Sequence, residues 1–438
     1  MAVKGDLSSE STRESKLSWK KKVLFSSISS MLMLGVLELC SRMALSDTSG
    51  YEISIASLRA EQMGIAASAR AKDSARENLH PYVGWTFDPL SSTGTEEVPI
   101  NVRGLLDFSD SIQKKQPGQF IIAITGGSFA QEFNDKMSEE LATRLSQHMN
   151  LEGREVHIVR LAMAGYKQPQ QLMWLTYLYS IGGEFDCVIN LDGFNEGVLP
   201  ITDNYNSKVH FSYPYGWDKR LLDIVDPRLT DLSFDILALR AKRQKLAKGV
   251  LDSPIRFLAM RNLIWRIQNS RISQELNQIS LEKFDYRWEF GKGFAVSGPP
   301  NPDPQTGDLQ TSVIDLWKNC SLQMRNLCVA NNTKYIHFLQ PNQYLDNSKT
   351  LSDWENEFAY DPKHDFHQVV LEMYPRMRAE SEWFAEHNVK FHDLTQIFKE
   401  TTETTYRDWC CHVNNEGNQL VAEAVLEAII EKLNTGAN

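Results

Sequence analysis

Short runs of mostly apolar residues recur along the chain, and longer stretches with a helical spacing separate them. A run of six or seven residues with this composition predicts a strand that is buried on both faces, as in a parallel sheet. Five such runs are expected to be strands: FIIAIT (120–125), VHIVRLA (156–162), CVINLD (187–192), KYIHFLQ (334–340) and VKFHDL (389–394).

The stretches between these runs predict helices at about 136–149, 168–181, 308–330, 366–387 and 414–434. Strands that alternate with helices indicate a parallel sheet with helices on both faces. Five strands suit a flavodoxin-like, three-layer α/β/α sandwich, in which functional groups gather at the C-terminal ends of the strands.

The alternation breaks once, between the third and fourth expected strands. Residues 200–333 contain no clear core strand, and we expect them to form a large helical insertion. Part of the insertion is basic: between residues 236 and 272 one acid, Asp252, stands against Arg240, Lys242, Arg243, Lys245, Lys248, Arg256, Arg261, Arg266 and Arg271. This pattern allows a solvated helical cap, a lid over a substrate, or a contact with an anionic membrane or polymer.

An uncharged apolar run near the N-terminus, residues 23–37, directly follows three lysines at 20–22. Its fifteen residues are fewer than the roughly 20 that span a bilayer as a helix. The run therefore suits the core of a signal peptide, or an anchor that extends through Leu45. Lysines ahead of such a run favour a cytoplasmic tail, here residues 1–22, with the rest of the chain exported to the periplasm or the outside.

We expect an uncleaved anchor at 23–45, because no clean small-x-small cleavage site follows the run. The alternatives are a cleaved signal peptide, which would make the protein secreted, and a buried N-terminal helix in a cytosolic protein. Residues 46–79 are polar with a helical pattern, and we expect them to form a stalk near the membrane.

Charge and cysteine content exclude some functions. The formal net charge of -10 argues against nucleic acid as a partner, because binding to a phosphate backbone needs a cationic surface. Six cysteines are too few for a disulfide scaffold in 438 residues, and without a CxxC pair a structural zinc site is not expected. The sequence leaves open whether Cys320 and Cys328 form a bridge.

The first candidate for chemistry is Ser128, which follows the expected strand at 120–125 through Gly126 and Gly127. It is either a helix cap at an ordinary strand-to-helix turn or a nucleophile held at a strand end. A serine nucleophile needs a base, usually a histidine that a carboxylate orients. It also needs hydrogen-bond donors for the oxyanion that forms.

The ends of other expected elements offer such partners. Gly165 follows the second strand, and Asn195 follows the third just past an Asp-Gly turn. Asp408 and His412 stand just ahead of the last amphipathic helix. Each has an ordinary alternative: a turn glycine, an asparagine that caps a turn or helix, and a histidine in a surface loop.

Taken together, these blocks resemble the SGNH hydrolase superfamily, also called GDSL-type esterases. GGSFA matches the first sequence block of the family, with Ser128 as the nucleophile. Gly165 matches the second block, and the Gly-Phe-Asn that ends at Asn195 matches the third. Asp408 and His412 match the last block. The resemblance covers roughly residues 80–199 and 334–435, and it implies a hydrolase domain formed by residues 80–199 and 334–438. The apolar helix that ends in ELCSR and the HPYVGWTFDP segment are similar to those of membrane-anchored bacterial members.

The resemblance implies a flavodoxin-like fold without a metal or organic cofactor. It implies an oxyanion hole formed by the backbone N–H groups of Ser128 and Gly165 and the side chain of Asn195. His412 would be the base and Asp408 its orienter. The implied activity is hydrolysis of an ester, with an O-acetyl group on a carbohydrate or envelope polymer, or a lipid ester, as the expected substrate class. An O-acyltransferase with the same residues and a binding module without catalysis are the alternatives.

The chain departs from the family pattern in two places. The first block reads Gly-Gly-Ser instead of Gly-Asp-Ser, and Asp408 precedes His412 by four positions where three are commoner. Cys410 and Cys411 fill the extra length. A catalytic cysteine needs a positively polarised and partly exposed niche, and Ser128 is the better-placed nucleophile. We therefore expect the two cysteines to be packing residues or a strained vicinal pair.

Overall fold

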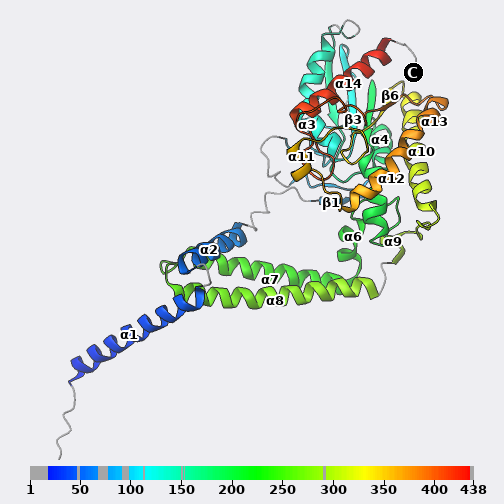
Figure 1. Ribbon diagram of the computed structural model, residues 1–438. Helices are drawn as coiled ribbons and strands as arrows, with labels where there is room; N and C mark the ends of the chain where they lie inside the picture. The colour runs from blue at the N-terminus through cyan, green and yellow to red at the C-terminus, as the bar shows by residue number, and fades with distance from the viewer. Residues whose placement is uncertain are drawn as a thin grey trace, which may run out of the picture. The chain divides into compact units, whose positions relative to one another are not determined.

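The computed structural model (Figure 1) describes residues 18–46, 50–67, 77–90, 98–111, 114–148, 151, 153–289 and 293–434. The chain divides into two compact units, one formed by residues 1–71 and 232–284 and the other by residues 72–231 and 285–438. Both ends of the expected insertion, 200–231 and 285–333, therefore belong to the second unit, which also contains the sheet.

The second unit is built on a sheet of five parallel strands in the order β4-β3-β5-β6-β7. The strands are β3 (Gln119–Gly126), β4 (Glu155–Arg160), β5 (Cys187–Asp192), β6 (Lys334–Leu339) and β7 (Phe391–Asp393). All five lie where the apolar runs predicted strands. The order reverses at β3, as in flavodoxin-like sheets, so the structure confirms the predicted fold class.

Helices cover both faces of this sheet. On one face α3 (Ser128–Ser146) packs against α14 (Asn415–Asn434), and on the other α4 (Gln170–Ser180) packs against α10 (Asp308–Ala330) (Figure 1). The side chains of β3 and β5 are almost all buried, which explains why these strands read as continuous apolar runs. The sheet thus forms the middle layer of an α/β/α sandwich.

Two predicted helices differ from the structure. α3 begins at Ser128 instead of near residue 136, because the chain turns directly from β3 into the helix. The single helix expected at 366–387 is divided into α12 (Asp365–Ala379) and α13 (Ser381–Glu386).

The segment HPYVGWTFDP takes part in a small antiparallel hairpin of β1 (Glu77–His80) and β2 (Gly84–Phe87). The Trp85 side chain is buried and packs edge-on against Tyr166, with ring centroids 5.1 Å apart. The Tyr166 hydroxyl donates a hydrogen bond of 2.5 Å to the Trp85 carbonyl. The hairpin is therefore attached to the turn that follows β4.

The insertion is helical, as predicted. In the second unit it contributes a π-helix (Pro200–Tyr205), α6 (Trp217–Val225), α9 (Gly293–Ser297) and α10. Two longer helices, α7 (Pro227–Leu251) and α8 (Ala259–Glu289), lie mostly in the first unit and run side by side there (Figure 1), where the Arg243 Nε donates 2.6 Å to Asn269. Whether the insertion acts as a lid stays a prediction.

The first unit has its own small core. It joins α1 (Trp19–Leu45) and α2 (Tyr51–Ala67) to α7 and α8, and its buried residues are Leu45, Ile55, Leu58, Ala247, Val250, Ala259 and Trp265. The Glu38 carboxylate accepts hydrogen bonds of 2.7 and 3.1 Å from the first two N–H groups of α8. A carboxylate at this position satisfies free helix donors and the helix dipole. Of the stalk expected at 46–79, residues 51–67 are helical and 77–80 form β1, while 47–49 and 68–76 lie outside the described residues.

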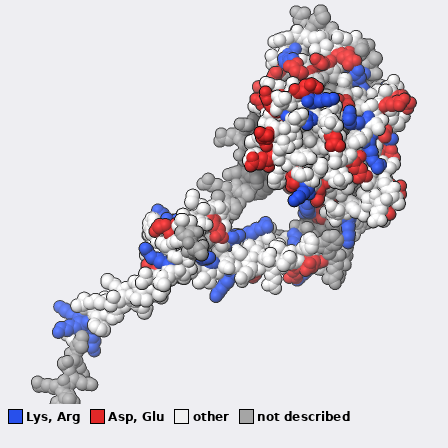
Figure 2. Space-filling view, in the orientation of Figure 1, with Lys and Arg blue, Asp and Glu red and all other residues white. Residues whose placement is uncertain are grey.

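Among the described residues, α1 is the helix that is long and apolar enough to cross a membrane. Its 27 residues extend over about 40 Å. Figure 2 shows a charge-free surface along the middle of α1, with basic side chains gathered at its start, where Lys20, Lys21 and Lys22 stand. A signal sequence near the N-terminus has the same character.

Candidate active site

Ser128 is the first residue of α3, directly after the C-terminal end of β3. The turn that precedes it requires glycine, because Gly126 has a φ of +152° and a Cβ there would overlap the Leu191 carbonyl. Gly127, and not Ser128, occupies the N-cap position. The N–H of Ser128 is among the first helix donors, which have no intrahelical partner. The capping alternative for Ser128 is therefore wrong, and its hydroxyl makes a different contact.

That contact is with His412. The Ser128 Oγ lies 2.8 Å from His412 Nε2, and His412 Nδ1 lies 2.5 Å from Asp408 Oδ2. With a neutral imidazole, Nδ1–H donates to the carboxylate and the serine hydroxyl donates to Nε2. This is the ring orientation that serine–histidine–aspartate catalysis uses. The structure thus brings together three residues that the sequence analysis selected.

The loop from Asp408 to His412 wraps around the Asp408 carboxylate through its own backbone N–H groups. The Oδ1 atom of Asp408 accepts hydrogen bonds from the N–H groups of Cys410, Cys411 and His412, at 3.0, 3.2 and 3.3 Å. Burial acts to raise the pKa of Asp408, but the hydrogen bond and charge of His412 and the loop N–H groups outweigh burial and hold the pKa below its usual range. The four-residue spacing therefore closes a turn that holds Asp408 as an anion.

A buried carboxylate fixes the chain that enters this loop. Glu355 Oε1 accepts the N–H groups of Thr405 and Tyr406, both at 2.8 Å, and Oε2 pairs with Lys349 Nζ at 2.9 Å. Tyr406 also forms an antiparallel bridge with Val413, just past His412. The base of the loop is thus closed by backbone pairing and by a fully buried ion pair.

The environment of His412 favours its protonated form. Burial alone would lower the pKa of His412, but the charge of Cys411 and the hydrogen bond and charge of Asp408 raise it to about 9. Burial raises the pKa of the Cys411 thiol well above 9, so Cys411 is neutral at ordinary pH. Asp408 is therefore the partner that raises the pKa of His412 at neutral pH.

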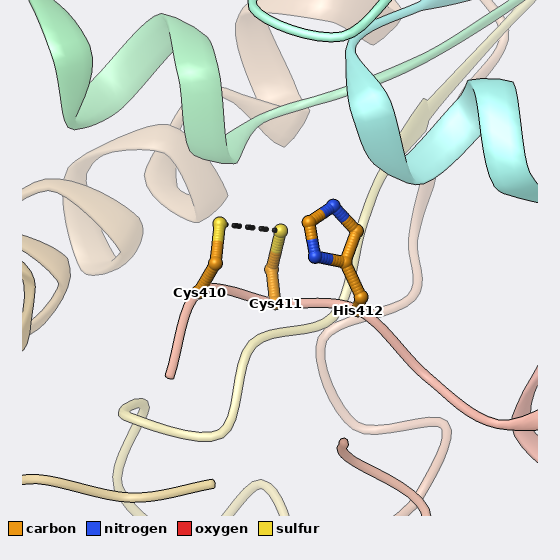
Figure 3. A group of neighbouring side chains, drawn as sticks. All are labelled: Cys410, Cys411 and His412. Atoms are coloured by element: carbon orange, nitrogen blue, oxygen red, sulfur yellow. Dashed lines mark hydrogen bonds between the residues drawn. The ribbon is translucent and has the colours of Figure 1, made fainter. Parts of the chain in front are cut away.

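Cys410 and Cys411 project to the same side of the loop as the His412 ring (Figure 3). Their Sγ atoms lie 3.2 Å apart, and both residues are free cysteines. The two sulfur atoms and a ring nitrogen of His412 lie within 4.8 Å of one another, which is close enough for them to share a cation. Both ring nitrogens already bond to Asp408 and Ser128, so a cation would have to displace one of these partners.

The expected oxyanion donors lie next to the Ser128 turn. A Cβ on Gly127 would collide with Asn195 Nδ2 and would lie 3.2 Å from the Tyr166 carbonyl oxygen. Asn195 Nδ2 donates 2.7 Å to that same oxygen, and Gly165 directly precedes Tyr166 with a φ of +81°. The structure therefore gathers the Ser128 turn, the Gly165 turn and Asn195 at one edge of the sheet.

Two buried ionisable residues near this edge, Glu196 and Lys167, were not predicted from the sequence. The Glu196 carboxylate accepts the Gly193 N–H at 2.7 Å, which fixes the turn that carries Asn195. Burial, and then the charge of Asp192, raise the pKa of Glu196 to about 8. The Lys167 Nζ donates 2.5 Å to the Phe211 carbonyl, and burial lowers its pKa to about 7. No feature of the sequence alone separates these residues from exposed ones.

The structure also contains a second Ser-His-Asp network that sequence reasoning missed. Ser321 Oγ lies 2.8 Å from His337 Nδ1, and His337 Nε2 lies 2.9 Å from Asp192 Oδ1. The His337 ring therefore presents Nδ1 to the serine and Nε2 to the aspartate, whereas His412 presents Nε2 to the serine and Nδ1 to the aspartate. All three residues are at most 1% exposed, and Trp317 also donates to Asp192. The network links β5, β6 and α10 inside the core.

Comparisons with known proteins add little to this geometry. No protein-family model matches the chain, and no curated protein sequence matches it significantly. Among solved structures, the chain is similar to a GDSL-like lipase from Bacteroides thetaiotaomicron VPI-5482, with 11% sequence identity and a TM-score of 0.31. The match covers 71% of this chain and 88% of that chain. A likeness at this TM-score assigns no role to any residue.

The pKa of His412 tests the arrangement directly. We expect NMR titration of the imidazole signals to give His412 a pKa above the usual 6.5 in the unmodified protein, because the Asp408 anion stabilises the imidazolium. Asp408→Asn should lower this pKa by roughly 1–3 units, because the anion that stabilises the imidazolium is lost while burial remains. The other histidine signals serve as the internal control. A His412 pKa at or below 6.5 before substitution would contradict the geometry.

Proposed function

We propose that the chain is a serine esterase, with Ser128 as the nucleophile, His412 as the general base and Asp408 as the residue that orients the imidazole. The observation that carries this proposal is the pair of contacts, 2.8 Å and 2.5 Å, that joins the three residues in order. Ser128 and His412 stand 284 positions apart, so only the fold brings them together. Nucleophile, base and orienter within hydrogen-bond reach are the requirement for this chemistry.

In the reaction, the neutral form of His412, whose share rises as the pH approaches the raised pKa, accepts the proton of Ser128 while the serine oxygen attacks the ester carbonyl. The N–H groups of Ser128 and Gly165 and the Asn195 amide stabilise the oxyanion of the tetrahedral intermediate. The ester C–O bond then breaks, and the imidazolium gives its proton to the leaving alcohol. Water repeats the sequence and releases the acid, which restores Ser128. Asp408 keeps the imidazole in the required tautomer throughout.

The second network is the weaker candidate for this role. Ser321, His337 and Asp192 are buried in the core, where neither an ester nor water has access to the hydroxyl. Ser321 also contacts Nδ1 of its histidine, whereas Ser128 contacts Nε2. We assign the buried network to the stability of the sheet, because a satisfied buried polar cluster specifies packing.

The fold and the positions of these residues support membership of the SGNH hydrolase superfamily. The three blocks that follow β3, β4 and β5 lie at the C-terminal edge of a flavodoxin-like sheet, where such sheets hold their sites. Within that family, the substrate we favour is an ester on a carbohydrate or an envelope polymer. The expected exported location of the domain supports this choice.

We further propose that α1 anchors the chain in a membrane and that the sheet-bearing unit lies outside the cytoplasm. Its length and charge-free middle support a spanning role, and the lysines at its start support a cytoplasmic N-terminus. A secreted form, cleaved after the same segment, is the alternative.

Reaction with a fluorophosphonate probe tests the nucleophile. We expect the unmodified protein to be labelled and to hydrolyse 4-nitrophenyl acetate, and Ser128→Ala to lose both properties, because no other hydroxyl contacts His412 Nε2 among the described residues. Ser321→Ala is the matched control. It should keep labelling but lower the melting temperature, since it leaves His337 Nδ1 unpaired at a cost of about 1–3 kcal/mol.

Labelling that persists in Ser128→Ala, or that disappears in folded Ser321→Ala, would move the nucleophile to the buried network.

Product analysis with a sugar acceptor distinguishes hydrolysis of the ester from acyl transfer. Acyl transfer to the sugar in excess of hydrolysis would reassign the protein as an O-acyltransferase.

Steady-state kinetics test the oxyanion donor. Asn195→Ala should lower kcat by roughly 10²–10³, because one donor to the oxyanion is removed. Asn206→Ala, which alters an exposed asparagine of the insertion, should leave kcat unchanged. A near-normal kcat in the folded Asn195 variant would remove this side chain from the oxyanion hole.

Membrane retention tests the anchor. The full chain should stay in the membrane pellet after an alkaline carbonate wash, and Leu34→Arg should reduce retention, because a central arginine costs about 2.5–3.5 kcal/mol of insertion free energy. N-terminal sequencing of the mature protein separates the two forms. A chain that begins after residue 45 and appears in the soluble fraction would identify a cleaved signal peptide.

A further inference from the structure

A pocket of about 250 Å³ lies in the sheet-bearing unit. Three segments form it: the turn of the β1–β2 hairpin, the start of α4, and the parts of the insertion that belong to this unit. The lining residues are Tyr82, Val83, Gly84, Pro169, Gln170, Met173, Ser212, Tyr213, Pro214, Trp217 and Ala295. Nothing in the esterase mechanism uses this pocket.

The pocket adjoins the turn that carries Gly165. A Cβ on Gly165 would lie 3.0 Å from Cδ1 of Tyr215, which stands between two lining residues of the insertion. A Cβ on Gly84 would likewise lie 2.8 Å from Pro214 Cγ. The segment from Pro214 to Trp217 therefore fills the space between the hairpin and the Gly165 turn. This segment thus connects the wall of the pocket to the Gly165 turn, which holds one of the expected oxyanion donors.

The walls of the pocket suit an uncharged ligand with flat faces. The lining contains no aspartate, glutamate, lysine, arginine or histidine. Trp217 and Tyr213 stand edge to face, with centroids 6.5 Å apart and planes at 89°, and Tyr82 stacks on Tyr177 at 5.3 Å. Aromatic faces provide large apolar contact areas, and the phenol hydroxyls add hydrogen-bonding groups.

The rings are held in place before any ligand arrives. Trp217 Nε1 donates 3.0 Å to the Ala295 carbonyl, which joins two distant parts of the insertion. The Tyr213 ring lies against Gly298, where a Cβ would be 2.8 Å from Cζ. Fixed side chains lose little conformational entropy on binding. The Tyr82 side is open, with 66% of that residue exposed, so the pocket is not an enclosed tunnel for an acyl chain.

We propose that this pocket is a subsite for one uncharged pyranose ring in the alcohol half of the ester, and that the insertion thereby selects a glycan substrate. The proposal rests on the proposed function, because the wall segment from Pro214 to Trp217 packs against Gly165, which is assigned to the oxyanion hole. The pocket has room for a single sugar ring, its aromatic faces match the CH-bearing faces of a pyranose, and the lining tyrosines and Ser212 carry hydroxyl groups.

Two acetates with different alcohols test the subsite. Glucose pentaacetate carries a pyranose ring and ethyl acetate does not, and a pH-stat follows both reactions without a chromophore that could enter the pocket. For Trp217→Ala, the ratio of KM for glucose pentaacetate to KM for ethyl acetate should rise roughly three- to tenfold, as expected for the loss of one aromatic contact. Tyr82→Ala, at an exposed position, should raise the same ratio and covers the case in which the Trp217 variant does not fold.

Trp354→Ala is the matched control, because Trp354 is 43% exposed and does not line the pocket. In this variant, the ratio of KM for glucose pentaacetate to KM for ethyl acetate should equal that of the unmodified protein. An unchanged ratio in both folded pocket variants would overturn the proposal. So would a selective rise in KM for 4-nitrophenyl decanoate, which would assign the pocket to an acyl chain.

A binding measurement separates this proposal from the proposed function. Equilibrium dialysis of glucose pentaacetate against Ser128→Ala should show binding that the additional Trp217→Ala change weakens. If the unmodified protein cleaves no ester but this binding is found, the esterase proposal fails and the subsite stands. If Ser128→Ala does not bind glucose pentaacetate, the subsite proposal is wrong.

Discussion

The arrangement at the sheet edge depends on one carboxylate, that of Asp408. Four N–H groups converge on it: three from the backbone of its own loop and one from the His412 ring. A carboxylate taken partly out of water is stable only when donors of this kind replace the lost solvation. The loop provides them, and the same donors fix the direction in which the imidazole points. Because Asp408 and His412 share one tight turn, their side chains move together.

The packing of two helices explains why the turn from Asp408 to His412 lies next to Ser128. α3 begins at Ser128, α14 begins just after His412, and the two helices pack against each other on one face of the sheet. An exposed pair of hydrogen bonds, both 2.6 Å, joins Arg144 near the end of α3 to Glu423 on α14. Ser128 and His412 are therefore positioned by helix packing on the same face, and Asn195 comes from the end of β5.

Much of this arrangement could be predicted from the sequence, because it is encoded locally. Strands buried on both faces read as apolar runs, and Ser128 and Asn195 stand where two of those runs end. What could not be predicted depends on contacts between distant segments. His337 and Asp192 lie inside apolar runs, and only the pairing of β5 with β6 shows that they meet. The division into two units also depends on tertiary packing, since Trp265 of the insertion joins a core with the N-terminal helices.

The space in front of Ser128 couples two positions of the chain that lie far apart in sequence. Asn195 occupies the volume that any side chain at position 127 would need. An aspartate at position 127 would therefore fit only if the asparagine moved. Gly127 and the present placement of Asn195 form one steric unit, so a side chain at position 127 requires a second change at position 195.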